Sequence, residues 1–165
     1  MNYVATGVSP NRKGNNHPNI VPYQVFEVCD GYVIVGVGND GQFERYCTIL
    51  GCADLARDPD YLTNSMRIEN REVLTALLSE RMITWTRTDF LDACAQNAVP
   101  ASSINAMEDV FAEPQIIARG LQQDVEGIPT VRNPIVFSDS TMVLDRASPK
   151  LGADTDTVLA ALKRR

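Results

Sequence analysis

The sequence predicts an α+β fold in which a small antiparallel sheet, starting with a hairpin, packs with several short helices. Two runs with strand composition, residues 23–28 and 32–37, flank the turn dipeptide Asp30-Gly31. Such a dipeptide tolerates the positive φ angles of a tight reversal, so the two runs are expected to pair antiparallel. Beyond residue 41 the apolar residues follow helical spacing instead, which is typical of amphipathic helices.

The first predicted helix spans residues 41–50, where the apolar side chains fall on one face and Gly51 fits the C-terminal cap. Residues 53–57 predict a single turn. Asn64 or Ser65 is then expected to cap one longer helix. The expected core-facing stripe of that helix consists of Ile68, Val73, Leu74, Leu77, Leu78 and Met82.

The middle of the chain predicts another helix and an edge strand. Thr86 and Asp89 have the spacing of a capping box in front of a helix at residues 90–97. Residues 99–104 suit an edge strand, because Pro100 cannot donate to a ladder. Further along, the pattern predicts two short helices and then polar strands around a glycine, at residues 106–111, 114–119 and 121–132.

The 165 residues are enough for one domain with a real core. We divide them into an extended arm (1–22), a small α+β domain (23–146) and a carboxy-terminal tail with a short helix (147–165). Prolines, glycines and asparagines argue against a regular element in the arm, which we expect to lie over another surface. In the tail, Asp154 is expected to cap a helix whose apolar face, Val158, Leu159 and Leu162, points inward.

Composition limits the partners of the chain. Hydrophobic residues make up 44% and charged residues 22%, as in soluble globular proteins. A net charge of −6 repels nucleic acid and anionic membranes, so neither is expected as a partner. No apolar run approaches the roughly 20 residues that span a bilayer, and residues 1–14 lack the pattern of a secretory signal. We therefore expect a cytoplasmic protein.

Neither a metal site nor a complete catalytic group is expected. Cysteines 29, 47, 52 and 94 have no C-x-x-C spacing, and His17 is the single histidine, so we expect free thiols and no metal. Nucleophilic catalysis needs an activated side chain beside a base. His17 lies in the proline-rich arm, where a loop residue bonded to backbone is the simpler interpretation, and Cys29 has no basic neighbour in the sequence.

Three glycines after the second strand, Gly36, Gly38 and Gly41, match the pattern G-x-G-x-x-G of dinucleotide-binding loops. We reject that function, because no second parallel strand follows and the strand entering the loop already has an antiparallel partner. The simpler interpretation is a tight strand-to-helix connection in which glycine relieves backbone crowding. Asp40 in this loop is either a catalytic carboxylate or a residue that satisfies loop amides or caps the next helix.

Several spaced motifs occur in a characteristic order. They read TGVSPNRKGNNHPNIVPYQVFE with DG, then GNDGQFERYCTILG, DPDYLTNSMRIENREVL, VPASSIN, EDVFAEPQIIARG, NPIVFSD and SPKLGADTDTVL. In this order they resemble the carboxy-terminal part of the class III CoA-transferases, the CaiB/BaiF family. The resemblance runs from about Asn2 to Leu162, nearly the whole chain.

This resemblance implies a small α+β domain whose partner is a large CoA-transferase domain or a second copy of the chain. In the family the large domain is Rossmann-like and carries the aspartate that is acylated and then holds CoA as a thioester. No residue of this chain matches that nucleophile, so no catalytic residue is expected here. The resemblance implies an acyl-CoA and a carboxylic acid as substrates, with coenzyme A as a substrate thioester rather than a tightly bound cofactor.

One functional element matches residue by residue. Gly36, Val37, Gly38, Asn39, Asp40, Gly41 and Gln42 occupy the position of the glycine-rich loop, which in formyl-CoA transferase-like members closes over the acyl-aspartyl intermediate. Relatives resembling carnitine CoA-transferase carry a similar G-N-D-G-Q form. The resemblance therefore implies a CoA-transferase fragment that contributes this covering loop. The alternative is a truncated, non-catalytic relative that acts as an interaction module.

Overall fold

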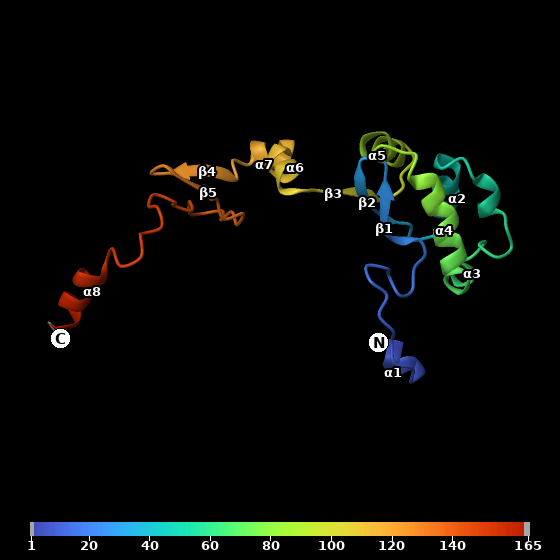
Figure 1. Cartoon of the computed structure of the whole chain (residues 1–165), viewed down its shortest axis with the longest axis horizontal. Helices are drawn as coiled ribbons and strands as arrows, with labels where there is room; N and C mark the ends of the chain where they lie inside the picture. The colour runs from blue at the N-terminus through green and yellow to red at the C-terminus, as the bar shows by residue number, and fades with distance from the viewer. Residues whose placement is uncertain (1, 164–165) are drawn as a thin grey trace. The chain divides into compact units, whose positions relative to one another are not determined.

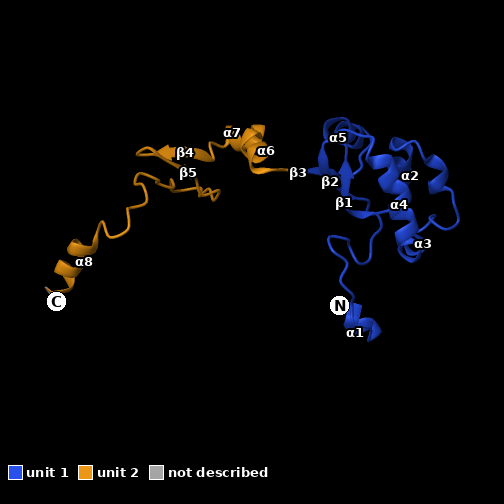
Figure 2. Ribbon diagram, in the orientation of Figure 1, with its two compact units in different colours: residues 1–104 blue, residues 105–165 orange. Residues whose placement is uncertain are grey.

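The computed structural model describes residues 2–163, so Met1 of the predicted arm and Arg164 and Arg165 of the predicted tail lie outside the described residues. The chain divides into two compact units, Met1–Ile104 and Asn105–Arg165 (Figure 2). The boundaries predicted at residues 22 and 146 stay predictions.

A three-stranded antiparallel sheet forms the base of the first unit, with the order β1-β2-β3. Its strands are β1 (Tyr23–Val28), β2 (Gly31–Gly36) and β3 (Ala101–Ile104). In the register of the hairpin, Phe26 lies opposite Val33. The turn needs glycine at Gly31, whose φ is +148°. The hairpin and the α+β class are thus confirmed.

Helices cover this sheet (Figure 1). The elements are α1 (Asn2–Thr6), α2 (Asp40–Ile49), the 3-10 turn η1 (Ala53–Ala56), α3 (Asn64–Glu69), α4 (Arg71–Met82) and α5 (Arg87–Gln96). α4 packs on β1, and α5 packs on β2 and β3. Thr86 caps α5 and accepts a hydrogen bond from the backbone N–H of Asp89, as predicted. α1 corrects the expectation that the arm holds no regular element.

The single long helix predicted from residue 64 to 82 is wrong, because the segment breaks at Asn70. There φ is −99° and ψ is 22°, outside the helical range. The Asn70 side-chain amide donates to the backbone oxygens of Asp60 and Met66, which competes with helix continuation. One residue, Asn70, therefore separates the end of α3 from the start of α4.

The cap of α3 also differs from the prediction. Thr63 caps the helix through its hydroxyl, rather than Asn64 or Ser65. Asn64 instead holds the arm: its side-chain oxygen accepts from the backbone N–H of Val21, and its amide donates to the backbone oxygen of Asn19. The arm lies over the first unit at this point.

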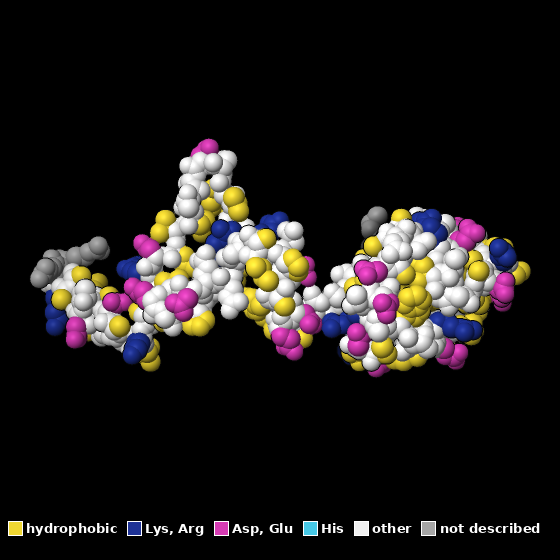
Figure 3. All heavy atoms as spheres, turned by 90° about the horizontal axis from the view of Figure 1, so that it is seen from above, with side chains coloured by type: hydrophobic (Ala, Val, Ile, Leu, Met, Phe, Trp, Pro, Cys, Tyr) yellow, Lys and Arg dark blue, Asp and Glu magenta, His cyan; other side chains and the backbone are white. Residues whose placement is uncertain are grey.

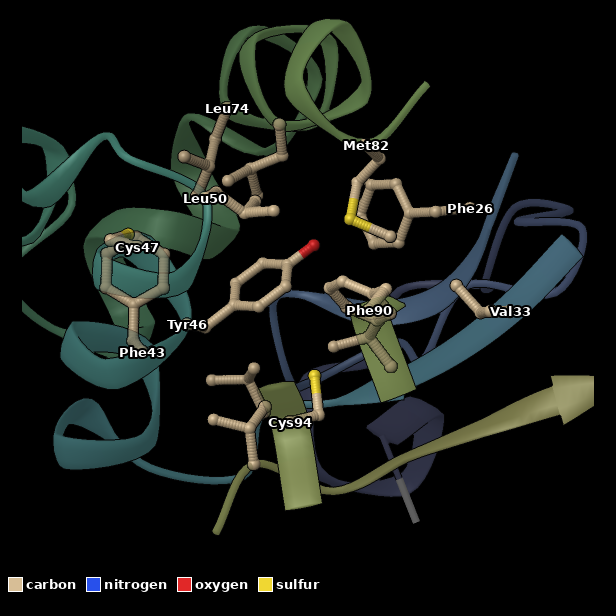
Figure 4. Packing of buried hydrophobic residues seen from close by; sticks show 14 of the residues in the cluster. Phe26, Val33, Phe43, Tyr46, Cys47, Leu50, Leu74, Met82, Phe90 and Cys94 are labelled. Atoms are coloured by element: carbon tan, nitrogen blue, oxygen red, sulfur yellow. The ribbon is translucent and has the colours of Figure 1, made fainter. Parts of the chain in front are cut away.

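Buried apolar side chains from the sheet and from α2, α4 and α5 form one core (Figure 4). Its largest members include Phe26, Phe43, Tyr46, Leu74, Leu78, Met82 and Phe90. The predicted stripe of α4 is confirmed at its buried positions but not at Val73 and Leu77, which are exposed. Tyr46 meets the edge of Phe90, with ring centroids 6.2 Å apart. Its hydroxyl is buried and has no hydrogen-bond partner among the described residues.

One charged side chain, Arg67, lies fully buried in the first unit. Its Nε donates to the backbone oxygen of Val21 at 2.8 Å and its Nη1 to that of Tyr61 at 2.9 Å. Its Nη2 donates to a carboxylate oxygen of Asp40 at 2.7 Å. The guanidinium also lies over the Phe43 ring, 4.4 Å from the centroid. Nothing in the sequence around Arg67 had indicated this role.

The second unit holds α6 (Met107–Ala112), α7 (Pro114–Ala118), β4 (Gln122–Val125), β5 (Ile128–Val131) and α8 (Thr155–Leu162). β4 and β5 form a hairpin around Glu126 and Gly127, both with positive φ, which confirms the polar strands predicted there. Among the described hydrophobic residues of this unit, only Val125 is buried.

The tail helix differs from its prediction. The side chain of Asp154 makes no capping hydrogen bond. The residues expected to face inward, Val158, Leu159 and Leu162, are exposed. Hydrophobic side chains are visible on the surface of this unit in the space-filling view (Figure 3). The apolar positions of α8 follow the predicted pattern, but the described residues of this unit form no core that the helix could join.

Replacing Tyr46 by phenylalanine should leave the free energy of unfolding unchanged or raise it by up to about 1 kcal/mol. The reason is that the substitution removes a buried hydroxyl that has no partner while keeping the ring contacts. Urea unfolding followed by the fluorescence of the single tryptophan, Trp85, which packs against Phe90, measures the effect. Tyr32→Phe, at an exposed position, is the control. A clear loss of stability in Tyr46→Phe would contradict the prediction.

Replacing Arg67 by lysine should lower the free energy of unfolding by about 2–4 kcal/mol. Lysine keeps the charge but cannot reproduce the planar set of bonds to Val21, Tyr61 and Asp40. Asp40→Asn should lower it by only about 1 kcal/mol, because the Asp40 side chain is 59% exposed. The same urea measurement tests this order, with the exposed Arg81→Lys as control. Equal and small decreases in the free energy of unfolding of Arg67→Lys and Asp40→Asn would show that the buried charge is not structurally important.

Candidate functional site

The predicted covering loop, residues 36–42, joins the end of β2 to the first turn of α2. Its first residues are held firmly: the N–H of Gly36 donates to the Pro100 oxygen at 2.9 Å, and that of Val37 to the Pro22 oxygen at 3.0 Å. The Val37 side chain is fully buried. The loop therefore starts from a fixed base between the arm and the segment that leads into β3.

The middle of the loop is fastened to the helix that follows. The Asn39 side-chain oxygen accepts from the N–H of Gln42 at 2.9 Å, which caps α2. The Gln42 side-chain oxygen in turn accepts from the N–H of Gly38 at 2.7 Å. This is a variant of the capping box, in which the Gln42 side chain reaches the N–H of the residue before the cap instead of the N–H of the cap itself. The Asn-x-x-Gln spacing is a sequence signal that could have identified Asn39 as the cap.

Asp40 therefore has neither of the structural roles predicted for it, since Asn39 caps the helix. Instead Asp40 forms an ion pair with Arg67, with 2.7 Å between Oδ1 and Nη2. Arg67 is buried while the Asp40 side chain is 59% exposed, so the pair lies where the core meets the loop surface. Its effect is to bind the beginning of α2 to α3.

The three glycines of the loop are not required by the backbone of this chain. Gly36, Gly38 and Gly41 are not among the residues with positive φ. A Cβ added to any of them would come no nearer than 3.4 Å to another atom, which at Gly38 is the flexible end of Gln42. The described contacts thus give no support to crowding as the reason for glycine. Gly38 and Gly41 are exposed, so their backbone is open to close approach from outside.

His17, Cys47 and Cys94 lie in surroundings that do not activate them. His17 stacks on Tyr23 with ring centroids 5.1 Å apart, and its Nδ1 accepts from the backbone N–H of Asn19, so it is a loop residue as expected. Burial raises the pKa of the Cys94 thiol to about 12. A hydrogen bond with Cys52, together with burial, raises the pKa of Cys47. These thiols are not activated nucleophiles at neutral pH.

Among residues 2–163, no group of three or more His, Cys, Asp or Glu side chains is arranged to hold a metal ion. In the same part of the chain, no helix has the length and apolar character that crossing a bilayer requires.

The sequence and the fold match known proteins over nearly the whole chain. The family model "CoA-transferase family III" matches residues 1–155. The chain is similar to a succinate–glutarate CoA-transferase of Agrobacterium fabrum, with 46% identity covering 99% of this chain and 42% of that protein. It is also similar to the human succinyl-CoA:glutarate CoA-transferase, with 38% identity covering 99% of this chain and 38% of that protein.

A solved structure shares the fold as well. The crystal structure of a CaiB/BaiF family protein from Brucella suis matches with a TM-score of 0.85 and 51% identity, over 98% of this chain and 43% of that one. The chain thus spans about two fifths of the length of these relatives. The motif order, the family model and the fold agree, and the chain belongs to CoA-transferase family III.

Proposed function

We propose that this chain is the small-domain part of an acyl-CoA transferase that moves CoA between dicarboxylic acids, with residues 36–42 covering the acyl intermediate. Family membership supports the reaction class, and the names of the two relatives at 46% and 38% identity support succinate and glutarate as the acid class. The single observation that carries the role of the loop is the contrast between its fixed base and its open glycines.

A loop with a fixed base and exposed glycine backbone is suited to covering a reactive acyl group. Bonds to Pro22 and Pro100 fix where the loop begins, and the Asn39 and Gln42 bonds fix where it joins α2. Between them Gly38 presents backbone without a side chain. A backbone that approaches a thioester or anhydride closely excludes water from it, which protects the intermediate from hydrolysis.

In this proposal the nucleophile belongs to a large domain outside residues 1–165, in the same or another chain. Partners of the proposed enzyme are that domain and, in the complete assembly, a second copy. The exposed apolar side chains of the second unit, among them Val136, Phe137 and Leu159, support such a partner, because exposed apolar surface favours burial against another surface. The same observation supports the second candidate, a non-catalytic interaction module.

A chimera separates the two candidates. The matching region of the Agrobacterium relative is replaced by this chain, and CoA transfer from succinyl-CoA to glutarate is measured. We expect transfer at a rate within about tenfold of the parent enzyme, because the two regions are 46% identical. A chimera with the parent's secondary structure and oligomeric state but without transfer would contradict the enzymatic proposal and favour the interaction module.

Within that chimera, Gly38→Ala should lower kcat by about tenfold or more, because a methyl group would hold the loop away from the intermediate. The free energy of unfolding should change by less than about 0.5 kcal/mol, since the added Cβ meets only the end of Gln42. Both quantities are measured on the same variant.

Gly51→Ala is the matched control. Gly51 has φ +68° and open space around it, so alanine there should lower the free energy of unfolding by about 1 kcal/mol while leaving kcat unchanged. Full activity in Gly38→Ala would mean that residues 36–42 do not cover the intermediate.

A further inference from the structure

A pocket of about 560 Å³ lies between the arm and the first turns of α4. Arg12, Lys13 and Asn16 line it from the arm, and Arg71, Glu72, Thr75 and Ala76 line it from α4. It shares no lining residue with loop 36–42. Its volume falls in the range of sites that hold small molecules.

Three cationic side chains meet at this pocket without a carboxylate partner. Arg12 and Lys13 are exposed and Arg71 is half-buried. Among the described residues the ion pair within 4.0 Å is Arg67 with Asp40, and none of these three cations forms one. In a chain with a net charge of −6, three unpaired cations around one cavity are a local reversal of charge.

Two buried polar atoms of the lining residues also have no hydrogen-bond partner within residues 2–163. They are Nη1 of Arg71 and Oγ1 of Thr75, which lie one turn apart on α4. The other terminal nitrogen of Arg71, Nη2, donates to the Pro18 oxygen at 3.0 Å, which holds the guanidinium in position. Desolvation lowers the pKa of Arg71, because the half-buried guanidinium is partly removed from water. Buried donors without partners are costly unless a ligand satisfies them.

The carboxylate of Glu72 indicates what kind of anion fits. It also lines the pocket, so it repels a bare anion but accepts hydrogen bonds from hydroxyl groups. A phosphate group supplies several acceptor oxygens and about two negative charges, which suits three cations and a threonine hydroxyl better than one carboxylate does. We propose that this pocket binds the phosphate group of a small hydroxylated phosphate monoester.

Titration calorimetry of the whole chain at low salt tests the proposal with three probes: glycerol 3-phosphate, inorganic phosphate and glutarate. We expect glycerol 3-phosphate to bind at least about fivefold more tightly than inorganic phosphate, because its hydroxyls reach Glu72. Glutarate should bind more weakly than either. Binding should weaken as salt is raised, because Arg12 and Lys13 are exposed.

Variants then locate the site. Thr75→Val keeps the shape of the side chain and removes a hydroxyl without a partner, so the fold should persist while the Kd for glycerol 3-phosphate rises by about threefold or more. Lys13→Gln should raise the Kd for glycerol 3-phosphate by a similar factor. Arg57→Gln removes an exposed cation that does not line the pocket and should leave the Kd unchanged.

Three outcomes would overturn the proposal. They are no measurable binding of either phosphate probe, equal Kd values in Thr75→Val, Lys13→Gln and Arg57→Gln, or a preference for glutarate. The last result would identify the pocket as a carboxylate site. Trp85 fluorescence confirms in each variant that the first unit is folded.

Discussion

The guanidinium of Arg67 is the interaction on which the first unit depends. It joins the end of the arm at Val21, the turn at Tyr61 and the first turn of α2 at Asp40. Separating one of these segments would cost about 1.5–3 kcal/mol where a backbone oxygen is lost, and only about 1 kcal/mol at the exposed Asp40 carboxylate. The arginine therefore couples the arm, the region before α3 and the loop at residues 36–42 into one cooperative piece.

This coupling explains how the loop can be both fixed and open. Its ends are held by backbone bonds to Pro22 and Pro100 and by the Asp40 ion pair. Each of its glycines has room beside it for a Cβ atom. A loop built this way keeps its position relative to the sheet while leaving bare backbone exposed. The cooperative piece thus presents exposed loop backbone on a fixed base.

Local features of the fold could be predicted from the sequence because neighbouring residues determine them. The Asp30-Gly31 turn and the Thr86 cap depend on a few adjacent residues, and both are confirmed. The order of motifs likewise identified the family. The helix break at Asn70 was missed, because a side-chain amide competing for backbone oxygens leaves the apolar spacing unchanged.

Features that depend on distant segments could not be predicted in this way. Arg67 looks like a solvent-facing residue of an amphipathic helix, and its acceptors at Val21 and Asp40 are far away in the sequence. The prediction that the apolar face of α8 points inward was wrong for a related reason. Periodicity shows that a helix has an apolar face, but it does not show whether the same unit contains a surface to cover that face.

The break at Asn70 has a consequence for how this region can change in evolution. It separates two arginines four positions apart, so that Arg67 points into the core while Arg71 lines the pocket beside the arm. Successive residues of a helix are rotated by about 100° around its axis. One insertion or deletion between the two arginines would therefore change the direction of one side chain relative to the other by about 100°. The stretch from Arg67 to Arg71 thus acts as a spacer of fixed length, tolerant of substitution at its exposed positions but intolerant of any change in length.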